Sequence, residues 1–207
     1  MISFSSIFLV PILMLLGVFH LHAQTTEVSV EALIRDHFGA QVEVVKDPNP
    51  TVLKGDFNGD GMGDLAVLVS PKGKRGELSP GVRMIHTAEG VRDPEAAEIL
   101  NGRNSLALVL GSASGWKSPK TGGKFLIYSF GWIGWKGSET GKLVVLSKSK
   151  LKRDKKGYAT LSPNNRVSLP GDSRGDLILV PTEGGINTIL YWNGKTYRFW
   201  LDPGETS

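Results

Sequence analysis

The sequence predicts a mainly β domain, built from antiparallel sheets, with one short helix near its start. Three observations favour this fold class. One early stretch has helical periodicity, the later apolar runs are short, and Gly, Pro, Asn and Ser separate those runs. The runs also follow one another too closely for helical crossovers, which indicates antiparallel pairing. An α+β domain is the alternative.

The helix is expected at residues 29–39, "SVEALIRDHFG". Ser29 can cap its first turn, and Gly39 suits its end. A second, short helix is expected at residues 93–102, where an Asp-Pro pair suits the start and a glycine suits the end. Four apolar side chains fall on one face of the first helix: Val30, Leu33, Ile34 and Phe38.

Short strands are expected in the rest of the chain, because turn-forming residues bound each apolar run. The strongest hairpin signal is the Asn193-Gly194 pair, which lies between the last two runs. The expected strands cover residues 51–57, 64–69, 81–87, 105–111, 124–130, 142–147, 158–162, 176–181, 187–192 and 196–201.

Residues 1–23 are expected to be a cleaved secretory signal. Their apolar run, from about Ile7 to Phe19, is shorter than the roughly 20 residues of a membrane span. Ala23 is a small residue before the expected cut, so the mature chain would start at Gln24 and be secreted or periplasmic, with no transmembrane segment. No Lys or Arg precedes the apolar run, so an uncleaved anchor is the alternative.

Residues 24–207 are expected to form a single secreted domain, because roughly 180 residues are ample for one core and short for two. The chain has no cysteine, which excludes disulfides and thiolate chemistry. Its formal net charge is +4, and a lysine-rich run covers residues 148–156. Such a short run is usually a solvated loop rather than a polyanion-binding patch, so no nucleic-acid partner is expected.

The stretch "GDFNGDGMGDLAVLV", residues 55–69, crowds acidic side chains beside an apolar run. Like charges at this spacing repel one another unless a cation lies among them. Counted from Asp56, side-chain oxygens occur at positions 1, 3, 5 and 9, and a glycine at position 6 permits a sharp bend. Calcium takes six to eight oxygens whereas magnesium usually keeps several waters, so Ca²⁺ is the expected ion. A metal-free turn is the alternative.

A helix-loop-helix calcium site is excluded, because Val67 stands where that loop needs a glutamate. The stretch instead resembles the calcium loop of the FG-GAP repeats of integrin α-subunit propellers and of bacterial VCBS-type repeats. Their pattern DxNxDGxxD, preceded by a strand and Gly and followed by Leu-Ala-Val, matches residues 55–67. The resemblance implies a calcium-loop hairpin at residues 51–70, with Phe57 packed under the loop.

The resemblance also implies the calcium ligands, which are the side chains of Asp56, Asn58, Asp60 and Asp64 and the main-chain carbonyl of Met62. A complete propeller is not expected, because it needs at least about four blades of four strands and this chain has one clear motif.

A second segment, "LPGDSRGDLILV" at residues 169–180, echoes "LKGDFNGDGMGDLAVLV" at residues 53–69. Each runs from a Gly-Asp turn into an apolar strand. The second segment is either a degenerate copy of the hairpin without a metal or a chance recurrence of a common turn. It contains the tripeptide Arg174-Gly175-Asp176, which is expected to be a turn before a strand rather than an integrin ligand.

The sequence shows no enzyme signature. The mature chain has only His37 and His86, and no nucleophile elbow or phosphate loop matches. Trp132 and Trp135, set among glycines, are either a sugar- or membrane-binding loop or buried anchors. Paired carboxylates for glycoside hydrolysis could come from five glutamates: Glu77, Glu89, Glu95, Glu98 and Glu183.

We therefore expect a secreted, calcium-binding, FG-GAP/VCBS-like module that is structural or binds an extracellular protein or glycan. An enzyme is the less favoured class. The alternatives are a secreted glycan-acting hydrolase and a proteinaceous inhibitor of such an enzyme.

Overall fold

A computed structural model gives the fold of the protein. It describes residues 29–46, 51–86, 99–102, 104–113, 115–116, 123–128, 143–162, 165–181 and 187–201. Most of the elements formed by these residues are strands, and one α-helix precedes the strands, so the prediction of a mainly β fold is confirmed. The strands form several open sheets rather than a propeller.

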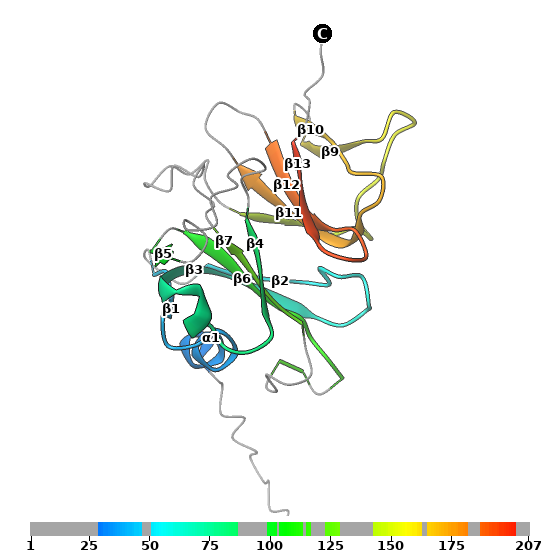
Figure 1. Cartoon of the computed structure of the whole chain (residues 1–207). Coiled ribbons are helices and arrows are strands. Elements are labelled where there is room, and N and C mark those ends of the chain that lie inside the picture. Colours follow the sequence, from blue (N-terminus) through cyan, green and yellow to red (C-terminus); the bar gives the residue numbers. More distant parts are fainter. Residues whose placement is uncertain are drawn as a thin grey trace, which may run out of the picture.

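In chain order, and with the labels of Figure 1, the elements are α1 (Val30–Phe38), β1 (Val42–Val44), β2 (Val52–Gly55), β3 (Asp64–Lys74), the short 3-10 helix η1 (Arg75–Glu77), β4 (Val82–His86), β5 (Ile99–Asn101), β6 (Ser105–Val109), β7 (Lys124–Tyr128), β8 (Val144–Leu146), β9 (Tyr158–Ser162), β10 (Asn165–Ser168), β11 (Arg174–Pro181), β12 (Asn187–Trp192) and β13 (Tyr197–Leu201).

The larger sheet has seven strands and is organised around β3. Its main order is β1-β3-β6-β7-β4, and both β2 and β5 also pair with β3. β3 can hold four partners because it is 11 residues long, so different parts of it face different strands. The pairs are antiparallel except for β4 with β7, which is parallel and departs from the predicted pattern.

The smaller sheet has four antiparallel strands in the order β13-β12-β11-β8. β9 and β10 form a separate antiparallel hairpin. The predicted turn between β12 and β13 is confirmed: Asn193 Oδ1 accepts the N–H groups of Lys195 and Thr196, and Gly194 has a φ of 95°. A glycine is favoured there because the left-handed region strains other residues.

The elements stack in four layers, which Figure 1 shows as α1, the seven-stranded sheet, the four-stranded sheet and the β9–β10 hairpin. Alternate residues along each strand point to opposite faces. On β3, Leu65, Val67 and Val69 face α1, while Ala66 faces the smaller sheet. On β11, Ile178 belongs to the core between the sheets. Apolar side chains therefore fill the spaces on both sides of each sheet.

The helix α1 begins and ends as the sequence predicts. Ser29 Oγ accepts the N–H of Ala32 at 3.1 Å, and Gly39 follows the last turn with a φ of 106°. Leu33, Ile34 and Phe38 are buried against the larger sheet. The apolar face thus explains why this segment is helical although the rest of the chain favours strands.

Each of the ten predicted strands overlaps one strand of the structure, but three further strands lie outside the predicted ranges. These are β1, β5 and β10. The prediction of a second helix at residues 93–102 is wrong at its C-terminal end, because Ile99–Asn101 forms β5 and pairs with the far end of β3. Pairing with a distant strand overrides the local helical signal there.

Several predictions fall on residues outside the described part. They concern the signal at residues 1–23, Trp132 and Trp135, and most of the glutamates considered for catalysis. Among the described residues, no helix combines the length and apolar character that a membrane span requires.

Candidate metal centre

The acidic loop connects β2 to β3, which pair as an antiparallel hairpin from Val52 with Val67 to Gly55 with Asp64. Gly59 and Gly61 have φ angles of 77° and 84°, which allow the sharp bend. The hairpin predicted at residues 51–70 is therefore present.

The loop folds around the carboxylate of its first aspartate. Asp56 Oδ1 accepts the N–H groups of Gly59 at 2.8 Å and Asp60 at 3.1 Å, and Oδ2 accepts that of Gly61 at 2.9 Å. The curvature of the loop is therefore built from the side chain of Asp56.

The next two polar side chains lie at the exposed tip of the loop. Asn58 Oδ1 accepts the N–H of Asp60 at 2.9 Å, and Asp60 Oδ1 accepts the N–H of Met62 at 2.8 Å. The two side chains also bond each other, Asn58 Nδ2 donating to Asp60 Oδ2 at 2.8 Å. Because Asp60 is exposed, its carboxylate can rotate toward an ion at little cost.

Asp64, the last acidic residue of the loop, is fully buried at 0% exposure. Its Oδ2 accepts the N–H groups of Phe57 at 2.7 Å and Asn58 at 3.2 Å, and its Oδ1 accepts that of Gly111 at 2.7 Å. Burial raises the pKa of Asp64 to about 6, although the three N–H donors act in the opposite direction. Asp64 thus anchors the loop, and Phe57 is buried under it in the core between the sheets.

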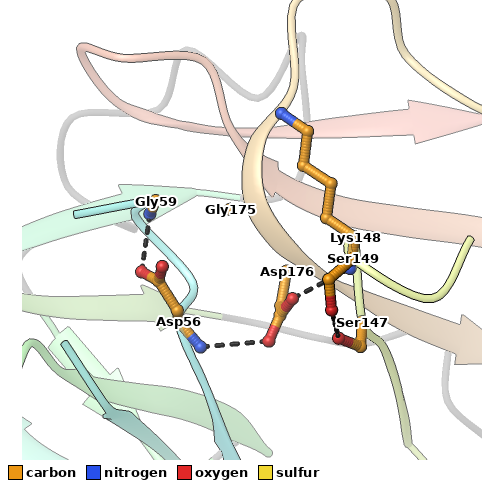
Figure 2. A pocket seen from close by; sticks show the side chains of 7 residues that line it. All are labelled: Asp56, Gly59, Ser147, Lys148, Ser149, Gly175 and Asp176. Carbon is orange, nitrogen blue, oxygen red and sulfur yellow. Dashed lines mark hydrogen bonds between the residues drawn. The ribbon is translucent and has the colours of Figure 1, made fainter. Parts of the chain in front are cut away.

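The loop also bonds to the smaller sheet. Asp176 Oδ2 accepts the N–H of Asp56 at 3.1 Å, and the N–H of Asp176 donates to the carbonyl of Asp56 at 2.6 Å. The other oxygen, Asp176 Oδ1, accepts the N–H of Lys148 at 2.9 Å. Figure 2 shows the carboxylate of Asp176 between the backbone of the loop and the segment after β8. The acidic loop therefore lies at the junction of the two sheets.

A pocket of about 470 Å³ opens at this junction. It is lined by small and polar residues from both sheets, and Figure 2 shows their arrangement. Two lining serines bond each other, with their Oγ atoms 3.1 Å apart. The lining residues are Asp56, Gly59, Ser147, Lys148, Ser149, Gly175 and Asp176.

Asp64 and Asp176 occupy equivalent positions in the two sheets. Each lies near the start of a strand and accepts an N–H from a residue just beyond the neighbouring strand, Gly111 for Asp64 and Lys148 for Asp176. The leucine after each aspartate pairs with a residue on the neighbouring strand, Leu65 with Val109 and Leu177 with Leu146. In both cases the donor lies two residues beyond that paired residue.

The two echoing segments thus share a backbone arrangement as well as a sequence pattern. The second segment lacks the first strand of the hairpin, because β10 pairs with β9 instead of β11. The tripeptide from Arg174 to Asp176 forms the first three residues of β11 rather than a turn before it, and its aspartate accepts backbone N–H groups.

The donor set of the loop fits a hard cation. Every predicted ligand atom is an oxygen, which suits calcium rather than metals that prefer nitrogen or sulfur. In the conformation described, no three acidic, His or Cys side chains among the described residues converge closely enough to hold a metal ion. The carboxylates are instead turned onto backbone N–H groups. In the core that also holds Phe57, the buried hydroxyl of Tyr197 has no hydrogen-bond partner among the described residues.

Comparisons with protein-family models, with curated proteins and with solved structures found no match to this chain. The likeness to FG-GAP and VCBS-type loops therefore rests on the residues of the loop alone.

A chain of contacts links the acidic loop to α1. His37 Nε2 lies 2.8 Å from the carbonyl of Trp116, and Trp116 Nε1 donates to the carbonyl of Gly63 at 2.5 Å. No sequence pattern singled out Trp116 or Gly111, because both act over long separations. Asp176 was signalled by the repeated Gly-Asp-Leu pattern.

Of the residues considered for catalysis, the structure describes the side chains of His37 and Glu77. His37 is buried at 1% exposure under the larger sheet, and Glu77 accepts the N–H of Lys74 at 3.0 Å. Both have structural contacts, and no catalytic role follows from them.

We expect His37 to make stability depend on pH. Burial lowers its pKa below the ordinary value of 6.5, and the nearby Lys124 acts in the same direction, whereas the contact with Trp116 and the charge of Asp36 oppose it. The folded protein therefore holds fewer protons on His37 than the unfolded chain does. This contribution is fully present above about pH 6.5 and is lost as the pH falls. Lowering the pH from 7 to 5 should therefore reduce the free energy of unfolding.

The measurement is chemical denaturation of the unchanged protein and of His37→Gln at both pH values, with chelator present. Glutamine keeps an N–H donor for the Trp116 carbonyl but does not titrate in this range. Asp64 acts with the opposite sign, because its raised pKa favours folding at low pH, so only the difference between the two proteins isolates His37. Equal pH dependence in both would contradict the prediction.

Proposed function

We propose that the protein is an exported, calcium-binding module of the FG-GAP/VCBS type, with a structural or binding role outside the cytoplasm. The observation that carries the proposal is the position of the loop. Its residues follow the order of an FG-GAP calcium loop, and its first aspartate bonds the start of β11 in the other sheet.

The side chains of Asp56, Asn58, Asp60 and Asp64 and the carbonyl of Met62 would hold the ion. Calcium would supply positive charge among three carboxylates that otherwise repel one another. Asp56 and Asp64 are already fixed by backbone donors, so little ordering is needed at those two positions.

A cation at this place would stabilise the junction of the sheets as well as the loop. Phe57 belongs to the core between the sheets, and the N–H of Asp56 bonds Asp176. A module of this kind presents a rigid surface, and the partner we propose is an extracellular protein or glycan.

The test is a thermal melt of the purified protein with millimolar calcium and again with excess chelator. Extracellular calcium modules bind with dissociation constants of about 10⁻⁴ to 10⁻³ M. Millimolar calcium should therefore add roughly 0.4 to 1.4 kcal/mol of stability by mass action, which corresponds to a rise of a few degrees in melting temperature. Asp60→Ala should abolish this rise.

The matched control is Asp36→Ala, which removes an exposed carboxylate from α1 and should leave the calcium-dependent rise intact. Asp154 is less suitable, because it pairs with Arg166 and accepts the N–H groups of Lys156 and Tyr158. Identical melts with and without calcium, together with a flat calorimetric titration, would show that the loop is an ordinary turn that binds no calcium.

A further inference from the structure

Tyr197 is a buried residue of β13 whose ring packs across the two sheets. The ring meets Phe125 of β7 edge-on, with centroids 5.1 Å apart, and lies tilted against Trp192 of β12 at 5.0 Å. The residue is only 3% exposed. Aromatic packing therefore fixes the ring without any help from its hydroxyl.

The hydroxyl of Tyr197 is in a less favourable situation. It is buried, yet it has no hydrogen-bond partner in the part of the chain that the structure describes. Buried polar groups in native proteins nearly always have a partner, and a buried hydroxyl without one destabilises the fold. This hydroxyl can therefore donate to a group that the protein binds beside it.

The surroundings of the hydroxyl indicate where that partner lies. Tyr197 shares its core cluster with Phe57, the loop residue whose N–H bonds Asp64. Burial raises the pKa of Tyr197 above its ordinary value, and the negative charges of Asp64, Asp56 and Asp60 raise it further. Trp192 pairs with Tyr197 on β13 and with Arg174 on β11, two residues before Asp176, which bonds Asp56. Tyr197 therefore belongs to the part of the smaller sheet that meets the acidic loop.

We propose that the Tyr197 hydroxyl is a positioning group of the cation site, supplied by the C-terminal sheet. This inference rests on the proposed binding of calcium by the loop. In the loaded protein the hydroxyl donates to an oxygen of the site, and without the cation it is left unpartnered. Cation binding and docking of the β12–β13 hairpin thereby stabilise each other.

The variant Tyr197→Phe tests this, because it removes the hydroxyl and keeps the ring. In excess chelator its melting temperature should equal or exceed that of the unchanged protein, because an unpartnered hydroxyl has been removed. Its calcium affinity, measured by calorimetric titration of the whole protein, should weaken about tenfold, as is usual for groups that support a metal site. A packing role would instead lower stability equally in both conditions.

The matched control is Tyr191→Phe on β12. Tyr191 is also buried, but it faces the cluster shared with the β9–β10 hairpin, away from the core that holds Phe57. Its replacement should leave calcium affinity unchanged.

The outcomes separate the two proposals. If the unchanged protein binds calcium and Tyr197→Phe binds it equally well, the role of Tyr197 is overturned while calcium binding stands. An equal loss of stability with calcium and with chelator also overturns it. If the unchanged protein shows no calcium binding, the proposed function fails and this inference fails with it.

Discussion

Replacing Asp64 by alanine should lower the free energy of unfolding of the calcium-free protein by about 3 kcal/mol. Asp64 is fully buried, and its carboxylate accepts the N–H groups of Phe57, Asn58 and Gly111. Each buried donor left unpaired costs about 1 to 3 kcal/mol, and water entering the space can offset part of the loss. Urea unfolding at pH 7 with excess chelator measures the effect.

The isosteric variant Asp64→Asn should be less severe. Asparagine keeps one acceptor oxygen, but its NH₂ group would face backbone N–H groups that need an acceptor, so some of the hydrogen bonds are lost. Asp36→Ala serves again as the exposed control and should change stability little. If Asp64→Ala were as stable as that control, the carboxylate would not be the anchor of the loop.

Gly175→Ala should cause the second large loss, because this glycine touches the acidic loop. A Cβ built at Gly175 would lie 2.6 Å from the nitrogen of Gly59 and 2.9 Å from the carbonyl carbon of Phe57, and closer still to the carbonyl oxygen of Asp56. These are backbone atoms, so the loop itself must shift. The φ of 71° adds strain of its own. We expect a loss of at least about 3 kcal/mol and a weaker calcium response.

Gly157→Ala separates the effect of the close contact with the loop from the effect of the backbone strain. Gly157 has a φ of 88°, but nothing lies within 4 Å of a Cβ added there. This variant should therefore show the backbone strain alone, about 1 to 2 kcal/mol. Denaturation curves of both variants give the difference, which reports the contact between loop and β11. Equal losses would show that this contact contributes nothing.

The local features of the protein followed from neighbouring residues. Ser29 and Gly39 bound α1 as expected, and Asn193 with Gly194 forms the turn between β12 and β13. The bonds that shape the acidic loop around Asp56 span at most five residues. Side chains that bond the backbone over such short distances encode their geometry in the sequence itself.

The contacts that place the loop could not be predicted in this way. Asp176 bonds Asp56 across 120 residues, Gly111 bonds Asp64 across 47, and Trp116 bonds Gly63 across 53. Nothing near these residues in the chain specifies their partners. Likewise, β5 became a strand only because the end of β3 extends beyond its other partners.

The sequence by itself determined that short apolar runs would form strands and that an oxygen-rich, sharply bent loop would precede β3. Only the tertiary structure decided that this loop joins two sheets and that Tyr197 shares a core cluster with Phe57 of the loop. The physical reason is that turn and cap geometry is set by hydrogen bonds within a few residues, whereas the choice of neighbouring strands is set by burying apolar faces brought together from the whole chain.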